Sequence, residues 1–65
     1  MIIVNGEIHS IRADETLLDL LEEQGYRIEV IAVEYNGAIL SKAAYATTTL
    51  HDGDRIEIVS FVGGG

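Results

Sequence analysis

The stretch RIEIVSFVGGG, residues 55–65, decides how the rest of the chain is read. Ile56 and Ile58 alternate with polar residues, which predicts a β-strand with one buried face. The strand passes without a polar spacer into three glycines, which lack a Cβ and can lie extended in a channel too narrow for other residues. Three extended glycines span about 10 Å. We therefore expect a thin arm that presents the carboxylate of Gly65 to another protein.

The glycines have a simpler interpretation as a frayed end or a remnant of expression, because chain termini are often disordered and without function. Two features count against it. The glycines adjoin a strand directly, and the tail has none of the Ser, Lys or Glu residues that collect in linkers. The remainder of the chain has to distinguish the two interpretations.

The amino-acid composition excludes several classes of site and partner. A chain of 65 residues is one domain with a small core, and it has no Cys, which excludes disulfides, thiolate nucleophiles and Cys-ligated metals. Four basic against eleven acidic residues give a net charge of −7, which disfavours nucleic acid and anionic membranes and favours a basic protein partner. No apolar run approaches the roughly 18 residues of a membrane span, and no signal peptide follows Met1. We expect a cytoplasmic protein.

The first twelve residues predict a β-hairpin. Apolar residues 1–4 and the run 7–12 flank Asn5-Gly6, a strong signal for a tight turn. Ile8 and Ile11 cannot share a face of a regular strand unless a bulge intervenes.

An amphipathic helix is predicted next, over residues 17–24. Thr16 and Asp19 have the spacing of a capping box, and Gly25 supplies a left-handed stop. The helix should bury one apolar stripe and turn its acidic residues to water. The stripe consists of Leu17, Leu20 and Leu21, and the acidic face of Asp19, Glu22 and Glu23.

The second half repeats the hairpin signal. An apolar run at 30–35 and a short strand at 38–40 flank Asn36-Gly37. Ser41 stands in N-cap position before an alanine-rich segment that fits one short helical turn.

Residues 51–54 have the composition of a turn, with positive φ expected at Gly53. Asp52 and Asp54 raise the alternative of a calcium loop, but further carboxylates at loop spacing are missing, so we favour the turn.

Val59 and Phe61 are in phase with each other and out of phase with the two isoleucines of the last strand. They should project from the sheet face opposite the helix, near the root of the tail. An exposed apolar pair there would suit docking of a partner. The alternative is that a loop or the second short helix covers both side chains.

The predicted order is strand, strand, helix, strand, strand, short helix, strand, and it resembles the ubiquitin-like β-grasp. The whole chain is similar to the ThiS family of sulfur carriers. The matching residues are Val4-Asn5-Gly6, Thr16-Leu17, Leu20-Leu21, Val33-Glu34-Tyr35-Asn36-Gly37, Leu50, Asp52-Gly53-Asp54-Arg55-Ile56-Glu57 and Phe61-Val62-Gly63-Gly64-Gly65. Where the family usually has a Pro-Arg pair, this chain has Ser41-Lys42.

The resemblance implies an α+β fold with a mixed sheet of four to five strands packed on one helix. Residues 1–61 would form the β-grasp domain and residues 62–65 a flexible tail. Gly63, Gly64 and Gly65 would enter partner active sites, and Val59, Phe61 and Val62 would contact the partners.

The resemblance also implies chemistry on the Gly65 carboxylate. An adenylating enzyme of the ThiF type would use ATP and magnesium to activate it. A persulfide donor would then convert it to a thiocarboxylate, and a thiazole synthase of the ThiG type would take the sulfur for thiamin. The chain would be a protein cosubstrate and no enzyme, a monomer when free, with no bound cofactor and no metal site. His9 and His51 lie far apart in the sequence and suggest no catalytic triad.

Two other functions fit parts of the sequence. The small subunit of molybdopterin synthase shares the fold and the Gly-Gly tail, although such chains are usually longer. A ubiquitin-like interaction module would need no free terminus. A fused C-terminal tag should leave such a module unharmed and destroy a carrier.

Overall fold

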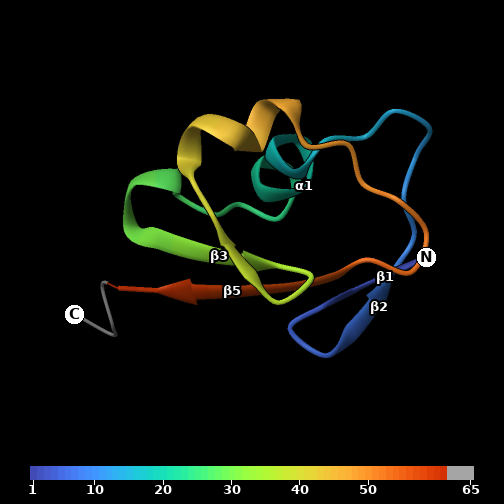
Figure 1. Ribbon diagram of the computed structural model, residues 1–65, viewed down its shortest axis with the longest axis horizontal. Helices are drawn as coiled ribbons and strands as arrows, with labels where there is room; N and C mark the ends of the chain where they lie inside the picture. The colour runs from blue at the N-terminus through green and yellow to red at the C-terminus, as the bar shows by residue number, and fades with distance from the viewer. Residues whose placement is uncertain (62–65) are drawn as a thin grey trace.

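The computed structural model describes residues 1–61. One mixed sheet of five strands forms the first layer, in the order β2-β1-β5-β3-β4, and the helices form the second (Figure 1). Strand β5 is parallel to β1 and antiparallel to β3. In chain order the elements are β1 (Ile2–Val4), β2 (Glu7–His9), α1 (Leu17–Glu23), the 3-10 helix η1 (Ile28–Val30), β3 (Ile31–Tyr35), β4 (Ala38–Leu40), the 3-10 helix η2 (Lys42–Thr47) and β5 (Arg55–Ser60). The predicted α+β β-grasp is confirmed; the tail, residues 62–65, lies outside the described residues, so its boundary and flexibility stay predictions.

Both Asn-Gly turns have the conformation that the sequence predicts. Asn5 and Gly6 have φ of 49° and 84°, and Asn36 and Gly37 have φ of 52° and 89°, so both central residues of each turn are left-handed, as a type I′ turn requires. The asparagines also bind the last strand. The side-chain oxygen of Asn5 accepts from the Ile58 amide at 2.7 Å, and that of Asn36 accepts from the Arg55 amide at 2.8 Å. Each hairpin turn therefore helps to hold β5 in place.

The first hairpin is shorter than predicted. Strand β2 ends at His9, so the prediction of a strand through residue 12 is wrong. Ile8 points outward with 67% of its surface exposed, whereas Ile11, beyond the strand, packs against the core. Ending the strand resolves the conflict of phase between the two isoleucines without a bulge. A similar shift occurs later, since Val30 belongs to η1 and β3 begins only at Ile31.

Helix α1 begins as its sequence predicts. The Asp19 amide donates to Thr16 Oγ1 at 3.1 Å, and the Thr16 amide donates to the Asp19 carboxylate at 3.0 Å, which completes the capping box. After the helix, Gly25 has φ of 81°, the left-handed conformation expected of the stop. Leu17 and Leu21 are fully buried. In the described chain, no helix is long and apolar enough to cross a membrane.

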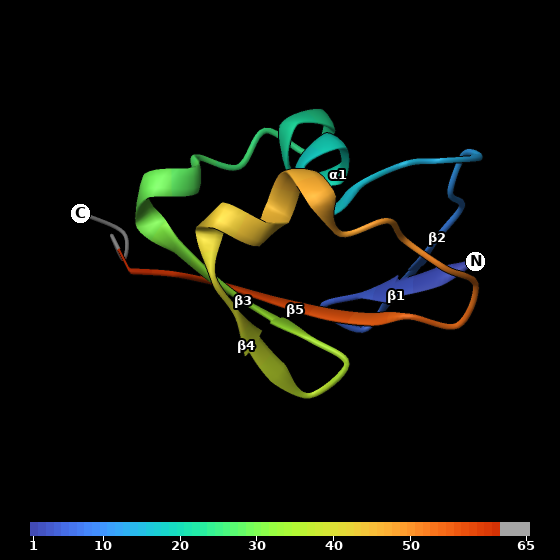
Figure 2. The same cartoon turned by 45° about the horizontal axis from the view of Figure 1, so that its top comes forward.

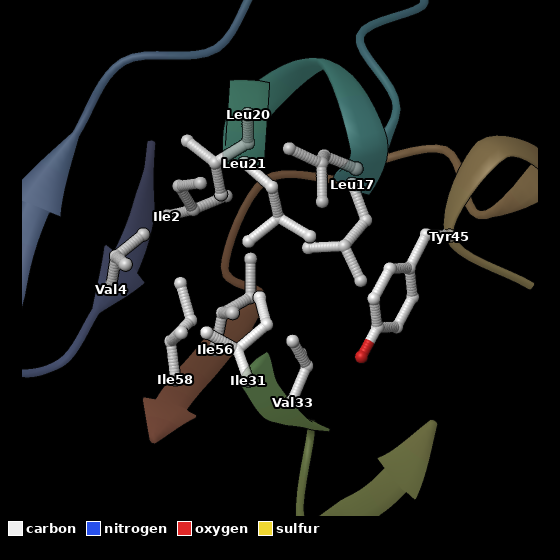
Figure 3. Close-up of a cluster of buried hydrophobic side chains, with 11 residues drawn as sticks. Ile2, Val4, Leu17, Leu20, Leu21, Ile31, Val33, Tyr45, Ile56 and Ile58 are labelled. Carbon is white, nitrogen blue, oxygen red and sulfur yellow. The ribbon is translucent and has the colours of Figure 1, made fainter. Parts of the chain in front are cut away.

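The core lies between the helices and one face of the sheet (Figure 3). Tyr45 joins it from η2, where its side chain is only 2% exposed. Helix η2 is a six-residue 3-10 segment, longer than the single turn predicted, and Ser41 at its N-cap makes no capping hydrogen bond through its side chain. The buried apolar residues are Ile2, Val4, Leu17, Leu20, Leu21, Ile31, Val33, Tyr45, Leu50, Ile56 and Ile58.

The turn at residues 51–54 contains a buried carboxylate. Gly53 has the expected positive φ, 91°. Asp54 is 7% exposed and accepts from Tyr35 Oη at 2.5 Å, from the His51 amide at 2.7 Å and from Asn36 Nδ2 at 3.1 Å. Its oxygens are thus occupied by protein donors, and it connects the second hairpin to the start of β5.

Candidate functional site at the end of strand β5

Strand β5 carries the candidate site because it leads to the glycines. It lies between β1 and β3, and its pairing with β3 continues to the Ile31–Ser60 pair. Beyond the strand, the Phe61 amide donates to the Val30 carbonyl at 2.7 Å. The backbone is therefore hydrogen-bonded to the sheet layer up to Phe61, immediately before the tail.

The side chains at this end of β5 divide between the two faces of the sheet. Ile56 and Ile58 are buried under the helices, as predicted. Val59 is 60% exposed and Phe61 65% exposed. The alternative in which a loop or helix covers these two residues is therefore wrong. Both apolar side chains are available to a partner next to the hydrogen bond between Phe61 and Val30.

Within residues 1–61, the sheet face opposite α1 and η2 has no covering helix, because both helices lie on the same side (Figure 2). We call this the outer face. In the register of β3 and β5, Glu34 lies directly opposite Glu57, and Ala32 opposite Val59. On the edge strand β4, Ile39 lies opposite Glu34. These five residues form what we call the outer-face patch.

The tail residues named by the sequence lie outside the described residues: Val62, Gly63, Gly64 and Gly65. Of the predicted site, the structure therefore describes Val59 and Phe61. The sequence did not predict that Glu34 and Glu57 lie opposite each other on adjacent strands.

The histidines show no catalytic arrangement. His9 Nε2 lies 3.8 Å from a Glu7 carboxylate oxygen at the end of β2, and His51 lies in the turn before β5. Within residues 1–61, no three His, Cys, Asp or Glu side chains come together in a way that could hold a metal ion. Residues 1–61 likewise enclose no detectable pocket.

The Asp54 network affects two ionisations. Burial alone would raise the pKa of Asp54, but the hydrogen bonds from Tyr35, the His51 amide and Asn36 outweigh it, so the pKa lies below its usual value. Burial and the hydrogen bond to the Asp54 carboxylate raise the pKa of Tyr35 to about 12. Both shifts favour the protonated phenol and the ionised carboxylate that the hydrogen bond requires.

Comparison with known proteins identifies the family. The ThiS family matches residues 2–65. The chain belongs to the ThiS family. The sulfur carrier protein ThiS of Bacillus subtilis is 39% identical over 66 residues and is matched over its full length, as is this chain. The crystal structure of a thiamine biosynthesis protein (ThiS) from Geobacter metallireducens superposes with a TM-score of 0.78 at 34% identity, covering 98% of this chain and 97% of that one.

Longer relatives also contain a segment similar to this chain. A thiazole synthase of Magnetococcus marinus is 44% identical over 62 residues, and one of Paramagnetospirillum magneticum is 42% identical over 64 residues. The match covers 95% and 98% of this chain but only 19% and 20% of those proteins. The chain thus spans about a fifth of their length.

Proposed function

We propose that this ThiS chain is a sulfur carrier for thiamin biosynthesis, and that its reactive group is the C-terminal carboxylate of Gly65. The observation that carries the proposal is the end-to-end match, over the full length of both chains, to a protein named as a sulfur carrier. The lack of Cys throughout the sequence supports it, because sulfur cannot be held on a thiol side chain of this protein.

The proposed chemistry has three steps, which together convert the Gly65 carboxylate to a thiocarboxylate. In the active site of an adenylating enzyme of the ThiF type, a Gly65 carboxylate oxygen attacks the α-phosphorus of magnesium-bound ATP, and pyrophosphate leaves. The terminal sulfur of a donor persulfide then attacks the acyl carbon and expels AMP. A thiol cleaves the resulting acyl disulfide, which leaves the thiocarboxylate and a disulfide between the thiol and the donor.

In this proposal the chain itself positions the carboxylate and does no acid, base or nucleophilic work with its side chains. The hydrogen bond from Phe61 to Val30 anchors the strand end, and the exposed Val59 and Phe61 offer apolar contacts, together with Val62. Gly63, Gly64 and Gly65 then add no side-chain bulk in a narrow channel.

The thiocarboxylate sulfur would next be delivered to a thiazole synthase of the ThiG type. Matches to chains named thiazole synthase support this partner, since those chains contain a segment similar to the whole of this one. Because adenylation consumes ATP, we place the carrier in the cytoplasm, where it would move between its enzymes as a monomer.

Intact-protein mass spectrometry tests the proposal. Incubation of the chain with the adenylating enzyme, ATP and a persulfide donor should add the mass difference between sulfur and oxygen. Deleting Gly65 moves the acyl carbon by one residue, about 3.5 Å. A misplacement of even 1 Å can cost on the order of a hundredfold in rate, so the shortened chain should remain unmodified.

Two further variants sharpen this experiment. Gly64→Ala should slow loading because the added Cβ would obstruct a channel that admits only backbone. A C-terminal tag should abolish loading, whereas a ubiquitin-like interaction module would tolerate it. Sulfur acquired as readily by the truncated chain as by the intact one would contradict the carrier function of Gly65.

A further inference from the structure

Two glutamates occupy directly opposite positions on the outer face. Glu34 and Glu57 are opposite partners in the antiparallel β3–β5 pair, and both are exposed. Like charges in directly opposite positions destabilise a sheet. Among residues 1–61, neither carboxylate takes part in an ion pair, and Arg55, which lies on the same face two residues before Glu57, forms none with it. The described side chains therefore supply neither carboxylate with an ion-pair partner.

Apolar residues lie on two sides of this pair, and Arg55 lies on a third. Ile39 lies beside Glu34 on β4 and is 70% exposed, and the next pair of residues along the two strands is Ala32 and Val59. In protein interfaces the centre is usually depleted of charge and the rim is polar. The outer-face patch instead has two carboxylates directly beside its apolar residues. Any protein that covers the apolar residues must also remove water from the two carboxylates, which is costly without a counter-charge.

We propose that the outer-face patch binds the thiazole synthase, and that one arginine side chain of that enzyme inserts between Glu34 and Glu57. This inference rests on the proposed sulfur-carrier function. A guanidinium has five donors in a planar fork, so one arginine can hydrogen-bond to both carboxylates, and it carries the charge that the pair lacks. The apolar side chains of the patch would pack against apolar surface around that arginine.

Two observations favour the thiazole synthase as the occupant. Proteins of that name contain a ThiS-like segment within one chain, which links the two functions physically. Val59 belongs to the patch and is also the second-to-last residue of β5. An enzyme bound to the patch would therefore lie close to the end of β5, where the segment leading to Gly65 begins.

The proposal predicts effects of opposite sign on folding and on binding. Glu57→Gln or Glu34→Gln should raise the melting temperature of the free protein by roughly 1 to 5 °C, because the repulsion is removed. The same variants should weaken binding of the thiazole synthase about tenfold or more, because the arginine loses a charged partner. Glu22→Gln is the matched control, since Glu22 is an exposed acid on α1, makes no ion pair within residues 1–61, and gives the same change of net charge.

The experiment uses the full chain and the cognate thiazole synthase, with calorimetric titration for affinity and thermal melts for stability. Higher stability with lower affinity in both variants, and neither effect in Glu22→Gln, supports the proposal. Unchanged affinity in Glu34→Gln and Glu57→Gln overturns it, as does an equal loss of affinity in Glu22→Gln, which would show a response to net charge alone.

Sulfur loading of Gly65 separates this inference from the proposed function. If the wild-type chain is loaded by the adenylating enzyme but the two variants bind the thiazole synthase normally, the arginine contact is wrong and the carrier function stands. If the wild-type chain is not loaded, both are refuted.

Discussion

Substituting Asp54 by Ala should be strongly destabilising, although the residue stands in an exposed-looking turn. Its buried carboxylate accepts from the Tyr35 hydroxyl, the Asn36 side-chain amide and the His51 amide. A buried donor left without a partner costs about 1 to 3 kcal/mol. Tyr35 is half-buried and Asn36 exposed, so both can regain water, and we expect a total loss of about 2 to 4 kcal/mol. That is a large part of the roughly 3 to 10 kcal/mol expected for 65 residues.

Urea denaturation of the wild type, Asp54→Ala, Tyr35→Phe and the double variant measures this contribution. Tyr35→Phe alone removes one hydrogen bond and should cost about 0.5 to 1.5 kcal/mol. Because the two residues are in contact, their effects should not add, with a coupling of at least about 0.5 kcal/mol. A loss of stability below about 0.5 kcal/mol in Asp54→Ala would show that the network does not stabilise the fold, as would a double variant whose loss equals the sum of the two single losses.

Three other outcomes follow from the structure. Since the pKa of Asp54 is lowered, its contribution to the free energy of unfolding is complete above the unfolded pKa of about 3.9 and should be lost as pH falls below that value. Because the pKa of Tyr35 is raised, its contribution should be lost as pH rises from about 10 towards about 12. Urea midpoints of the wild type and Tyr35→Phe, measured across this pH range, check both signs. Leu21→Ala should cost about 2 to 5 kcal/mol because its side chain is fully buried, and an unchanged melting temperature would exclude it from the core. Phe61→Asp and Val59→Asp should weaken binding to the adenylating enzyme but leave the melting temperature nearly unchanged, because both side chains are exposed. Binding of the wild-type chain should also weaken as the salt concentration rises, and an affinity independent of salt would argue against electrostatic docking.

Local signals in the sequence were sufficient for much of the fold. The two Asn-Gly turns and the Thr16–Asp19 capping box depend on contacts between residues at most a few positions apart, and all three form as predicted. The alternation of Ile56 and Ile58 likewise predicted which face of β5 is buried. Where a short-range interaction decides the conformation, the sequence pattern is a direct record of it.

Element boundaries were less predictable because tertiary packing sets them. The apolar content of residues 7–12 and of Val30 favours a strand in both places. In the structure, however, Ile11 packs on the core only because the chain leaves the strand after His9. The Val30 carbonyl accepts from Phe61, a residue of the far end of the chain. Neither contact is visible in a local window of sequence.

The polar residues illustrate the same limit more sharply. The sequence assigned Asn5 and Asn36 only to turns, yet both side chains hydrogen-bond to β5, across 53 and 19 positions. It assigned Asp54 to a turn as well, without its role as an acceptor for three groups. A turn residue with a hydrogen-bonding side chain has a second possible function in tertiary contacts, and only the fold shows which one it fulfils.

The outer-face patch depends entirely on strand register. Glu34 and Glu57 each occupy an ordinary solvent-facing position in an alternating strand, and nothing in either strand predicts that they will be opposite each other. A shift of the β3–β5 register by two residues would keep every buried side chain inward and yet separate the two carboxylates. The alternation of buried and exposed residues alone therefore does not require this pairing. Because like charges stand opposite each other without being required to by the alternation, we look for their counter-charge in a partner. Glu57→Gln tests this, since it should raise the melting temperature and yet weaken binding of the thiazole synthase.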